Sequence, residues 1–383
     1  MIDTIKLELQ QSMYTIIDHD KFSPSTYEMF SSGPWIKGKV GFSKQNPTTK
    51  DKKDGLYKPR LSVTRRPLKG LGYQNTLYIE VSLPKLVFSN NFDELTNDDF
   101  ELVINKLYEV LKSMGVLAYP SKLPQANISS IHYGKNIILE DYTTPYSYIK
   151  ELKKVDINKI IDVNQTDYRN GGLSYKFHSN LFEFTFYDKI KDLEKSKLSE
   201  KRAINKSDYC QLSLLDYIDT KERITKPFEV LRLEIRLNNR TKIKQYLKKL
   251  KLDNIVTFDY LFNTKMAKLF LLSFYDKIFD QYIPTFETSS IIELVESIKA
   301  SNPEIKDGKV LELASSQNII NQLGVRELRN MVNDRTWYRV KNNLKKLNGT
   351  KSSLYLSNLR NKIDNFKQVR LVDYPQLMLN NVN

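Results

Sequence analysis

Four polar side chains could do chemistry if the fold brings them together: Glu80, His132, Tyr187 and Glu234. Each stands in a short segment where apolar and polar residues alternate. Two carboxylates and an imidazole are suitable ligands for Mg²⁺ or Mn²⁺, and a metal ion held by them polarises a phosphodiester. A neighbouring tyrosine hydroxyl becomes a nucleophile once it is activated. These residue types therefore predict chemistry on a phosphate ester, with Tyr187 as the attacking group.

Positive side chains accompany the candidate nucleophile. Lys189 and Lys191 follow Tyr187 closely, and Arg232 precedes Glu234 by two positions. An arginine presents a fork of donors that can neutralise a phosphate. We therefore expect Tyr187, Lys189, Lys191 and Arg232 to form the catalytic set, with Glu80, His132 and Glu234 holding the metal.

Each of these residues also has an ordinary structural interpretation. Glu80, Glu234 and Arg232 can form a salt-bridged polar face, and His132 can be a hydrogen-bonded strand histidine. His178, near a predicted hairpin tip, favours a structural or DNA-contacting role over metal binding. Three other tyrosines are alternative nucleophiles, although packing is the more usual role for each: Tyr175, Tyr209 and Tyr246.

Period-two alternation predicts the strands that position these residues. In EVLRLEIRL the leucines and the isoleucine fall on one face, and Arg232 and Glu234 fall on the other. The same test places Glu80, His132 and Tyr187 opposite the apolar residues of their own segments. If these strands are neighbours, the four candidates converge on one polar face. The predicted strand segments are MIDTIKLEL, WIKGKVGF, LSVTRRPL, TLYIEVSLPKLVF, ISSIHYGKNIIL, a hairpin over 173–188, and EVLRLEIRL.

Helical patterns surround and follow the strands. A helix is predicted from Thr96 to Met114, closed by Gly115, and others at KIKDLEKSKLSEKRAI and TKIKQYLKKLKL. Beyond about Asp253 the pattern stays helical. The chain is thus predicted to be α+β, with an antiparallel sheet backed by helices over residues 1–255 and a smaller helical domain, a candidate for DNA binding, over 256–383.

Composition narrows the class of partner. The 383 residues include 60 lysines and arginines against 45 acidic residues, a net charge of +15 that favours a polyanion such as nucleic acid. No apolar run approaches the roughly 18 residues of a membrane span, and the N-terminus lacks a signal pattern, so we expect no membrane partner and a cytoplasmic location. The single cysteine, Cys210, excludes an internal disulfide framework. With only 3 histidines, carboxylates must do most of any metal binding.

The segment ASSQNIINQLGVRELRNMV resembles a helix-turn-helix in outline, with Gly324 at the turn and Arg326 and Arg329 beyond it. Two packed helices without a DNA-reading role are the alternative.

An ordered set of segments resembles the replication initiators of filamentous bacteriophages, the gene II protein family. The set, which extends over about residues 1–258, consists of MIDTIKLEL, YIEVSLPKLVF, NISSIHYGKNI, FTFYDKIKDLE and FEVLRLEIRLNNRTKIKQYL. Tyr187 stands where the family's candidate nucleophile lies, and Arg232 and Glu234 match its Arg-x-Glu strand. Glu80 matches an acidic position before Ser-Leu-Pro-Lys. His132 stands where some relatives have an acidic residue, and the His-x-His pair of the wider superfamily is absent.

The resemblance implies a replication-initiator or relaxase-like nickase fold and an enzyme of rolling-circle replication. Such an enzyme nicks one strand at an origin in duplex DNA through a phosphotyrosine intermediate, leaving a 3′ hydroxyl for a host polymerase acting with a host helicase. It later cuts and rejoins the displaced single strand in the bacterial cytoplasm. Two other classes stay open from the residues alone: a non-catalytic DNA-binding replication or copy-control protein, and a metal-dependent nuclease that uses water.

Overall fold

The computed structural model describes residues 1–31, 41–48, 50–51, 55–68, 72–156, 165–169, 173–179, 181–192, 229–288 and 290–373. Within these ranges nine strands form one sheet in which every neighbouring pair is antiparallel. In sheet order they are β3 (Gly41–Gln45), β4 (Arg60–Leu68), β5 (Gly72–Ser82), β1 (Ile2–Gln10), β7 (Asn127–Leu139), β11 (Glu229–Leu237), β10 (Phe182–Asp188), β9 (Ser174–His178) and β8 (Gln165–Arg169). A separate ribbon pairs β2 (Tyr14–Ile16) with β6 (Val116–Ala118).

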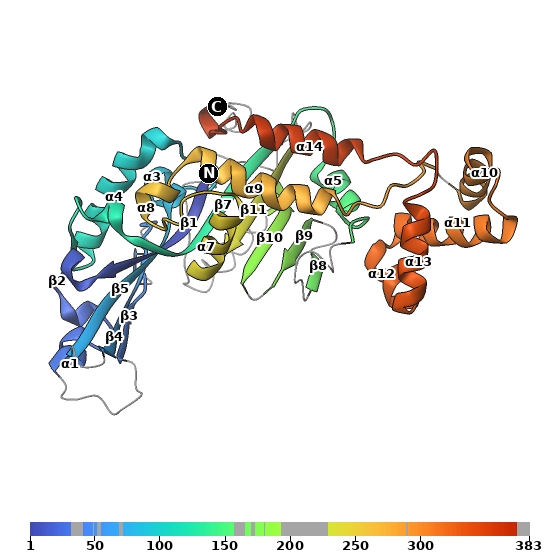
Figure 1. The fold of residues 1–383 in the computed structure, drawn as a ribbon. Helices are drawn as coiled ribbons and strands as arrows, with labels where there is room; N and C mark the ends of the chain where they lie inside the picture. The colour runs from blue at the N-terminus through green and yellow to red at the C-terminus, as the bar shows by residue number, and fades with distance from the viewer. Residues whose placement is uncertain are drawn as a thin grey trace.

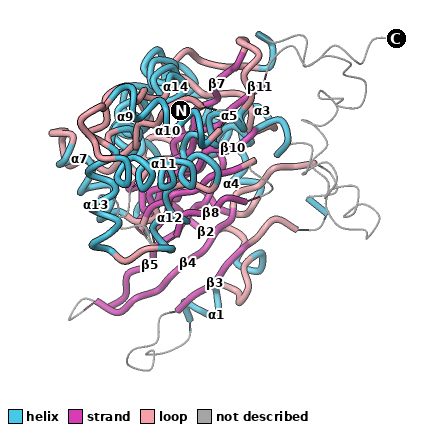
Figure 2. Tube along the Cα trace, turned by 90° about the vertical axis from the view of Figure 1, so that its right-hand side faces the viewer, coloured by secondary structure: helices cyan, strands magenta, loops and turns pink. Residues whose placement is uncertain are grey.

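The helices include α1 (Thr26–Ser31), α3 (Leu83–Phe88), α4 (Phe100–Ser113), α5 (Pro145–Leu152), α7 (Arg240–Lys249), α8 (Phe258–Leu261), α9 (Thr264–Phe279), α10 (Ile291–Ser301), α11 (Asp307–Gln322), α12 (Val325–Met331), α13 (Asp334–Leu344) and α14 (Leu354–Asn365). Figure 2 shows most of the helices on one side of the strands. The molecule is therefore α+β, as predicted, with a large antiparallel sheet backed by helices.

The main core lies between the sheet and these helices. Phe182, Phe184 and Phe186 alternate along β10 and are all buried, because every second side chain of a strand points to the same face. Phe182 and Phe184 pack against Phe274 of α9, with ring centroids 5.4 and 6.0 Å apart. On β7, Tyr133 stacks on Phe270 of the same helix at 5.4 Å. The polar residues that alternate with these buried aromatic residues therefore point to the opposite face of the sheet.

A second hydrophobic core lies within residues 283–347 and is centred on the buried Trp337 of α13. It contains residues of α10–α13, which Figure 1 shows grouped at one end of the molecule. The helices on either side of this segment, α9 and α14, pack in the first core and contact each other. The second core thus lies inside the range 256–383 predicted as the helical unit, whereas the flanking parts of that range cover the sheet.

Most predicted elements are confirmed where the structure describes them, including the helix from Thr96, the 173–188 hairpin and the strand EVLRLEIRL. A capping box between Thr96 and Asp99 opens the turn that leads into α4. The prediction of one strand over TLYIEVSLPKLVF is wrong in its second half: β5 ends at Ser82, and Leu83–Phe88 is helix α3. Pro84 explains this, because its fixed φ suits the first turn of a helix and it has no N–H for a strand partner.

Within the described ranges no helix combines the length and apolar character needed to cross a bilayer. Cys210, Tyr209 and most of the predicted helix KIKDLEKSKLSEKRAI lie outside the described residues.

Candidate functional site

Three of the four predicted site residues lie on adjacent strands and on the same face of the sheet. In the antiparallel register, Tyr187 of β10 stands opposite Arg232 of β11. On the other side of β11, Glu234 pairs with Gly134 and Arg236 pairs with His132 of β7. Cross-strand neighbours have Cβ atoms about 5 Å apart. The register therefore brings Tyr187, His132 and Glu234 together.

The Tyr187 hydroxyl donates a hydrogen bond to Glu234 Oε2 at 3.4 Å. Burial raises the pKa of Tyr187 well above its ordinary value, and although Arg232 opposes this shift, the negative charge of Glu234 adds to it. The hydroxyl consequently keeps its proton at neutral pH. Attack by this oxygen requires a proton acceptor, and Glu234 is the carboxylate in contact with it.

Glu234 is buried, and both of its oxygens have cationic neighbours. Oε1 accepts a hydrogen bond from Arg236 Nε at 2.8 Å, and Oε2 lies 3.9 Å from Arg232 Nε. His132 Nδ1 is 3.8 Å from Oε1. Burial lowers the pKa of His132, and Glu234 only partly opposes this, so the imidazole is neutral near pH 7.

Asp3, which alternation did not place on the polar face, completes this cluster. Asp3 Oδ2 forms an ion pair with Arg232 Nη2 at 3.0 Å, and Asp3 Oδ1 accepts a hydrogen bond from Ser82 Oγ at 3.4 Å. Burial would raise the pKa of Asp3, but Arg232 and then Lys189 hold it below its ordinary value. Asp3 is therefore the counter-charge of Arg232.

A β-bulge explains why alternation did not reveal Asp3. Strict alternation along β1 places Asp3 on the same side as Ile5, which is buried in the core. Ile2 pairs with Tyr133, whereas Ile5 pairs with Ile131, so three steps on β1 match two on β7. The extra residue turns Asp3 to the polar face. An acidic residue at an apolar position of a strand was the signal available in the sequence.

The side chain of Lys189 is fully buried. Its Nζ is 5.9 Å from the centre of the Tyr187 ring and has no hydrogen-bond partner among the described residues. Burial and then Arg232 lower the pKa of Lys189 to about 8. Lys191 is two residues further on, where its backbone N–H donates to Asp188 Oδ1 at 2.9 Å. Of the two predicted lysines, Lys189 is the one that faces Tyr187.

Glu80 lies apart from the other predicted metal ligands. Its strand, β5, is separated from β11 by β1 and β7, so three strand spacings of about 4.8 Å place it roughly 14 Å from Glu234. The Glu80 side chain is 47% exposed and lies 3.7 Å from Arg60 Nη1. The structure therefore does not bring Glu80 to His132 and Glu234.

The predicted metal ligands, Glu80, His132 and Glu234, are not arranged around one point. In the part of the chain that the structure describes, no group of three or more His, Cys, Asp or Glu side chains is arranged to hold a metal ion. His132 and Glu234 are neighbours, but Glu234 is already paired with arginines and Glu80 is three strands away. The donors as placed do not fit a preformed Mg²⁺ or Mn²⁺ site.

The alternative nucleophiles that the structure describes belong to the helix-covered core. The Tyr175 ring lies 4.9 Å from that of Phe177, and the Tyr246 ring stacks on Phe274 at 4.3 Å. His178 stands opposite Glu183 at the end of β9. None of the three contacts the Tyr187–Glu234 pair in a described interaction. The geometry therefore favours Tyr187 among the described candidates.

The predicted helix-turn-helix segment does form two helices. α11 ends at Gln322, Gly324 has φ +100°, and α12 begins at Val325. Arg329 of α12 lies 3.8 Å from Asp156 and 3.4 Å from Asp334, so its charge is satisfied within the chain. This pairing favours a packing role for Arg329; DNA reading by the segment stays a prediction.

No protein-family model, curated protein or solved structure matches this chain.

Proposed function

We propose that this chain is a rolling-circle replication initiator, a DNA endonuclease that nicks one strand at an origin through Tyr187 and later rejoins the displaced strand. The observation that carries the proposal is the contact between the Tyr187 hydroxyl and the buried carboxylate of Glu234. Around this pair the polar face carries Arg232, Arg236 and His132. A phenol beside a proton acceptor, with cations nearby, is the arrangement that transesterification of a phosphodiester requires.

In the proposed reaction the Tyr187 oxygen bonds to phosphorus while the bond from phosphorus to the 3′ oxygen breaks. The phenolic proton passes to Glu234 and returns to the departing 3′ oxygen, which leaves as a hydroxyl. The phosphotyrosyl bond conserves the energy of the broken phosphodiester. Rejoining therefore needs only the attack of a 3′ hydroxyl on this bond, without a nucleotide cofactor.

The two arginines have different positions in this scheme. Arg232 is buried, and its guanidinium bonds to Asp3 and to Asn136 Oδ1, so it acts by positioning the Glu234 carboxylate, which lies 3.9 Å from its Nε. Arg236 is 38% exposed and remains in contact with Glu234. Arg236 is thus the cation of this pair that can meet a phosphate entering from solvent.

The resemblance to the phage replication initiators contributes the expected fold, partners and location. The helix-backed antiparallel sheet is compatible with a replication-initiator or relaxase-like nickase fold. Origin DNA, a host polymerase and a host helicase are the proposed partners, in a bacterial cytoplasm. Mg²⁺ or Mn²⁺ is a prediction from the sequence only; it would neutralise charge on the phosphate oxygens, and none of the steps above depends on it.

The test is cleavage of an end-labelled single strand that contains the origin. Tyr187→Phe keeps the ring and removes the hydroxyl, so it should bind this strand normally and neither cleave it nor form a covalent adduct. With the wild-type chain, a denaturing gel should show label at the size of the protein. Unchanged cleavage by Tyr187→Phe would reject the nucleophile and favour a nuclease that uses water.

One observation favours a second candidate, a DNA-binding protein without chemistry. Arg232 and Arg236, the two arginines beside Tyr187, are both paired with carboxylates. A salt-bridged face of this kind can bind phosphates without cutting them. Absence of cleavage by the wild-type chain with any divalent metal ion, together with normal origin binding, would support this candidate.

A further inference from the structure

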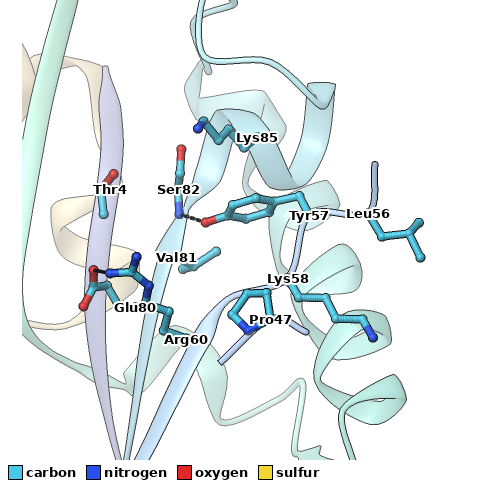
Figure 3. A pocket seen from close by; sticks show the side chains of 10 residues that line it. All are labelled: Thr4, Pro47, Leu56, Tyr57, Lys58, Arg60, Glu80, Val81, Ser82 and Lys85. Carbon is cyan, nitrogen blue, oxygen red and sulfur yellow. Dashed lines mark hydrogen bonds and ion pairs between the residues drawn. The ribbon is translucent and has the colours of Figure 1, made fainter. Parts of the chain in front are cut away.

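A cavity of about 330 Å³ opens beside Glu80, between the β4–β5 side of the sheet and the chain that leads into β4. Figure 3 shows Lys85 and Ser82 at one end of the cavity, Arg60 and Glu80 at the other, and the ring of Tyr57 between them. The Tyr57 hydroxyl accepts a hydrogen bond from the backbone N–H of Ser82 at 2.6 Å. This bond fixes the ring as one wall of the cavity.

The lining of the cavity carries more positive than negative charge. Lys58 and Arg60 have carboxylate partners, Asp51 at 2.6 Å and Glu80 at 3.7 Å. Lys85 lines the same cavity, and the described residues provide no ion-pair or hydrogen-bond partner for its ammonium group. A cavity lined by polar groups and by the unpaired ammonium group of Lys85 is suited to binding an anion.

Hydrogen-bonding groups and an apolar wall accompany this cation. Ser82 and Thr4 contribute hydroxyl groups to the lining, and Tyr57 and Leu56 contribute apolar surface. Hydroxyl and ammonium groups are common partners of phosphate oxygens in DNA complexes, and an aromatic ring gives the adjoining sugar or base a surface to pack on. The lining therefore matches a nucleotide phosphate better than a metal ion or an apolar ligand.

The cavity is connected to the candidate active site by side-chain contacts. Ser82 Oγ donates to Asp3 Oδ1 at 3.4 Å, and Asp3 Oδ2 pairs with Arg232 at 3.0 Å. Arg232 in turn stands opposite Tyr187 in the β10–β11 register. From β5 to β10 there are four strand spacings of about 4.8 Å, so roughly 19 Å separates Ser82 from Tyr187. A DNA strand crossing the polar face at right angles to the β-strands would pass both positions.

We propose that this cavity binds a phosphate of the single-stranded DNA substrate, a few nucleotides away from the phosphate that Tyr187 attacks. Lys85 contributes the charge, Thr4 the hydroxyl contact and Tyr57 the packing surface, while the Ser82 hydroxyl is bonded to Asp3. The proposal rests on the proposed function, because it takes the strand held by the cavity to be the strand that is cut. It gives Glu80 a role in orienting Arg60 at this cavity.

The test is the affinity for a single-stranded origin oligonucleotide, measured by fluorescence anisotropy at several salt concentrations. To prevent cleavage, all variants carry Tyr187→Phe. Lys85→Gln should weaken binding about fivefold to tenfold and reduce the salt slope by about 0.7, the value for one lost phosphate contact on a single strand. Lys85→Arg should keep the slope. The matched control is Lys106→Gln, which removes an exposed, ion-paired charge on α4 and should change neither quantity.

Neutral methylphosphonate linkages, placed one at a time along the oligonucleotide, locate the contact. A methylphosphonate linkage a few nucleotides from the cleavage point should weaken the affinity of the chain that keeps Lys85. The same linkage should leave the affinity of Lys85→Gln unchanged. Equal behaviour of Lys85→Gln and Lys106→Gln would overturn the proposal, and so would a linkage effect that persists in Lys85→Gln. If inorganic phosphate binds through Lys85 while oligonucleotide affinity is independent of it, the cavity is a free-anion site and the proposal is wrong.

Failure of the subsite and failure of the proposed function give different results. If the chain with Tyr187 cleaves DNA and Lys85→Gln does not change the affinity, the proposed phosphate site is rejected and the proposed function is retained. If the affinity depends on Lys85 but no cleavage or adduct is seen, the nickase activity is rejected and the cavity is retained as a DNA-binding site. No measurable affinity for the single strand overturns both. Thermal melting of Lys85→Gln confirms that a loss of affinity is not a loss of folding.

Discussion

Arg232 of β11 reaches Asp3 of β1 across the strand that separates them, β7, and it passes over Gly134 on the way. A Cβ atom at Gly134 would lie 2.6 Å from Arg232 Nη2 and 3.0 Å from its Cζ. The missing side chain therefore makes room for the guanidinium. This relationship joins the first strand of the chain to the strand that carries Glu234.

Gly134→Ala should displace the Arg232 guanidinium from Asp3. We expect a loss of about 1–3 kcal/mol in the free energy of unfolding, as for other overpacked buried sites, and a large loss of DNA cleavage. The matched control is Gly308→Ala in α11, where an added Cβ meets nothing within 4 Å. Urea unfolding and the gel assay measure the two effects. Wild-type cleavage by Gly134→Ala would show that the Arg232–Asp3 contact is dispensable.

Glu234→Gln should abolish cleavage with little change in DNA affinity. The amide cannot accept the Tyr187 proton, and loss of a general base typically lowers a rate by about 10²- to 10⁴-fold. Because Glu234 is buried, its side chain contributes little to contact with DNA. Glu183→Gln is the control, since Glu183 pairs with Arg236 at 3.3 Å on the same face without a described contact to Tyr187. Equal rates for the two variants would exclude Glu234 from proton transfer.

Lys189→Met should stabilise the fold and impair cleavage. The folded pKa of about 8 lies below the ordinary value of 10.5, so between these pH values the unfolded chain binds the extra proton. Stability should therefore rise from about pH 8 to 10.5 in the unmodified chain, and this rise should be smaller in Lys189→Met. At pH 7 we expect a gain of about 1–3 kcal/mol from removing a buried, unpaired charge. A lower melting temperature for Lys189→Met at pH 7 would contradict this account.

Glu94→Gln should destabilise the chain strongly. Burial would raise the pKa of Glu94, but Lys135 holds it below its ordinary value. Glu94 bonds to Lys135 Nζ, to the Asn136 N–H at 2.6 Å and to the Val369 N–H at 3.1 Å, so it joins β7 to the segment after α14. Removing one partner of a buried ion pair costs about 3–5 kcal/mol.

The control for this loss is an exposed ion pair. Asp364→Asn breaks the pair with Lys268 at the surface and should leave the melting temperature nearly unchanged, because solvent screens that interaction. Calorimetry of both variants measures the difference. Similar melting temperatures would show that the Glu94 contacts contribute little to stability.

Much of the fold could be predicted because its elements repeat a simple pattern. Phe182, Phe184 and Phe186 mark one face of β10 by alternation, and their burial is confirmed. The same alternation placed Tyr187, Glu234 and His132 on the opposite face, as the structure has them. The helix over LPKLVF was missed because its apolar residues also suit a strand. Pro84 is the residue that favours a helix over a strand in this segment.

The positions of Asp3 and Glu80 could not be predicted in the same way. Alternation describes one strand at a time, whereas a bulge is defined by two strands and their hydrogen bonds. The bulge beside Ile2 turns Asp3 toward Arg232, and the order β5-β1-β7-β11 keeps Glu80 away from Glu234. Both facts depend on pairing between segments far apart in the sequence.

Along strands without a bulge, such as β10 and β11, the sequence alone determined which residues point away from the core, because side-chain direction follows from the geometry of a single strand. Only the tertiary structure decided which of those residues meet. Strand order and register place the Tyr187 hydroxyl in contact with Glu234 and bring Asp3 to Arg232. They also place Glu80 in the lining of a separate cavity. The physical reason is that strands pair with segments far apart in the sequence. Which strands pair, and in which register, depends on the packing of the whole sheet against its helices.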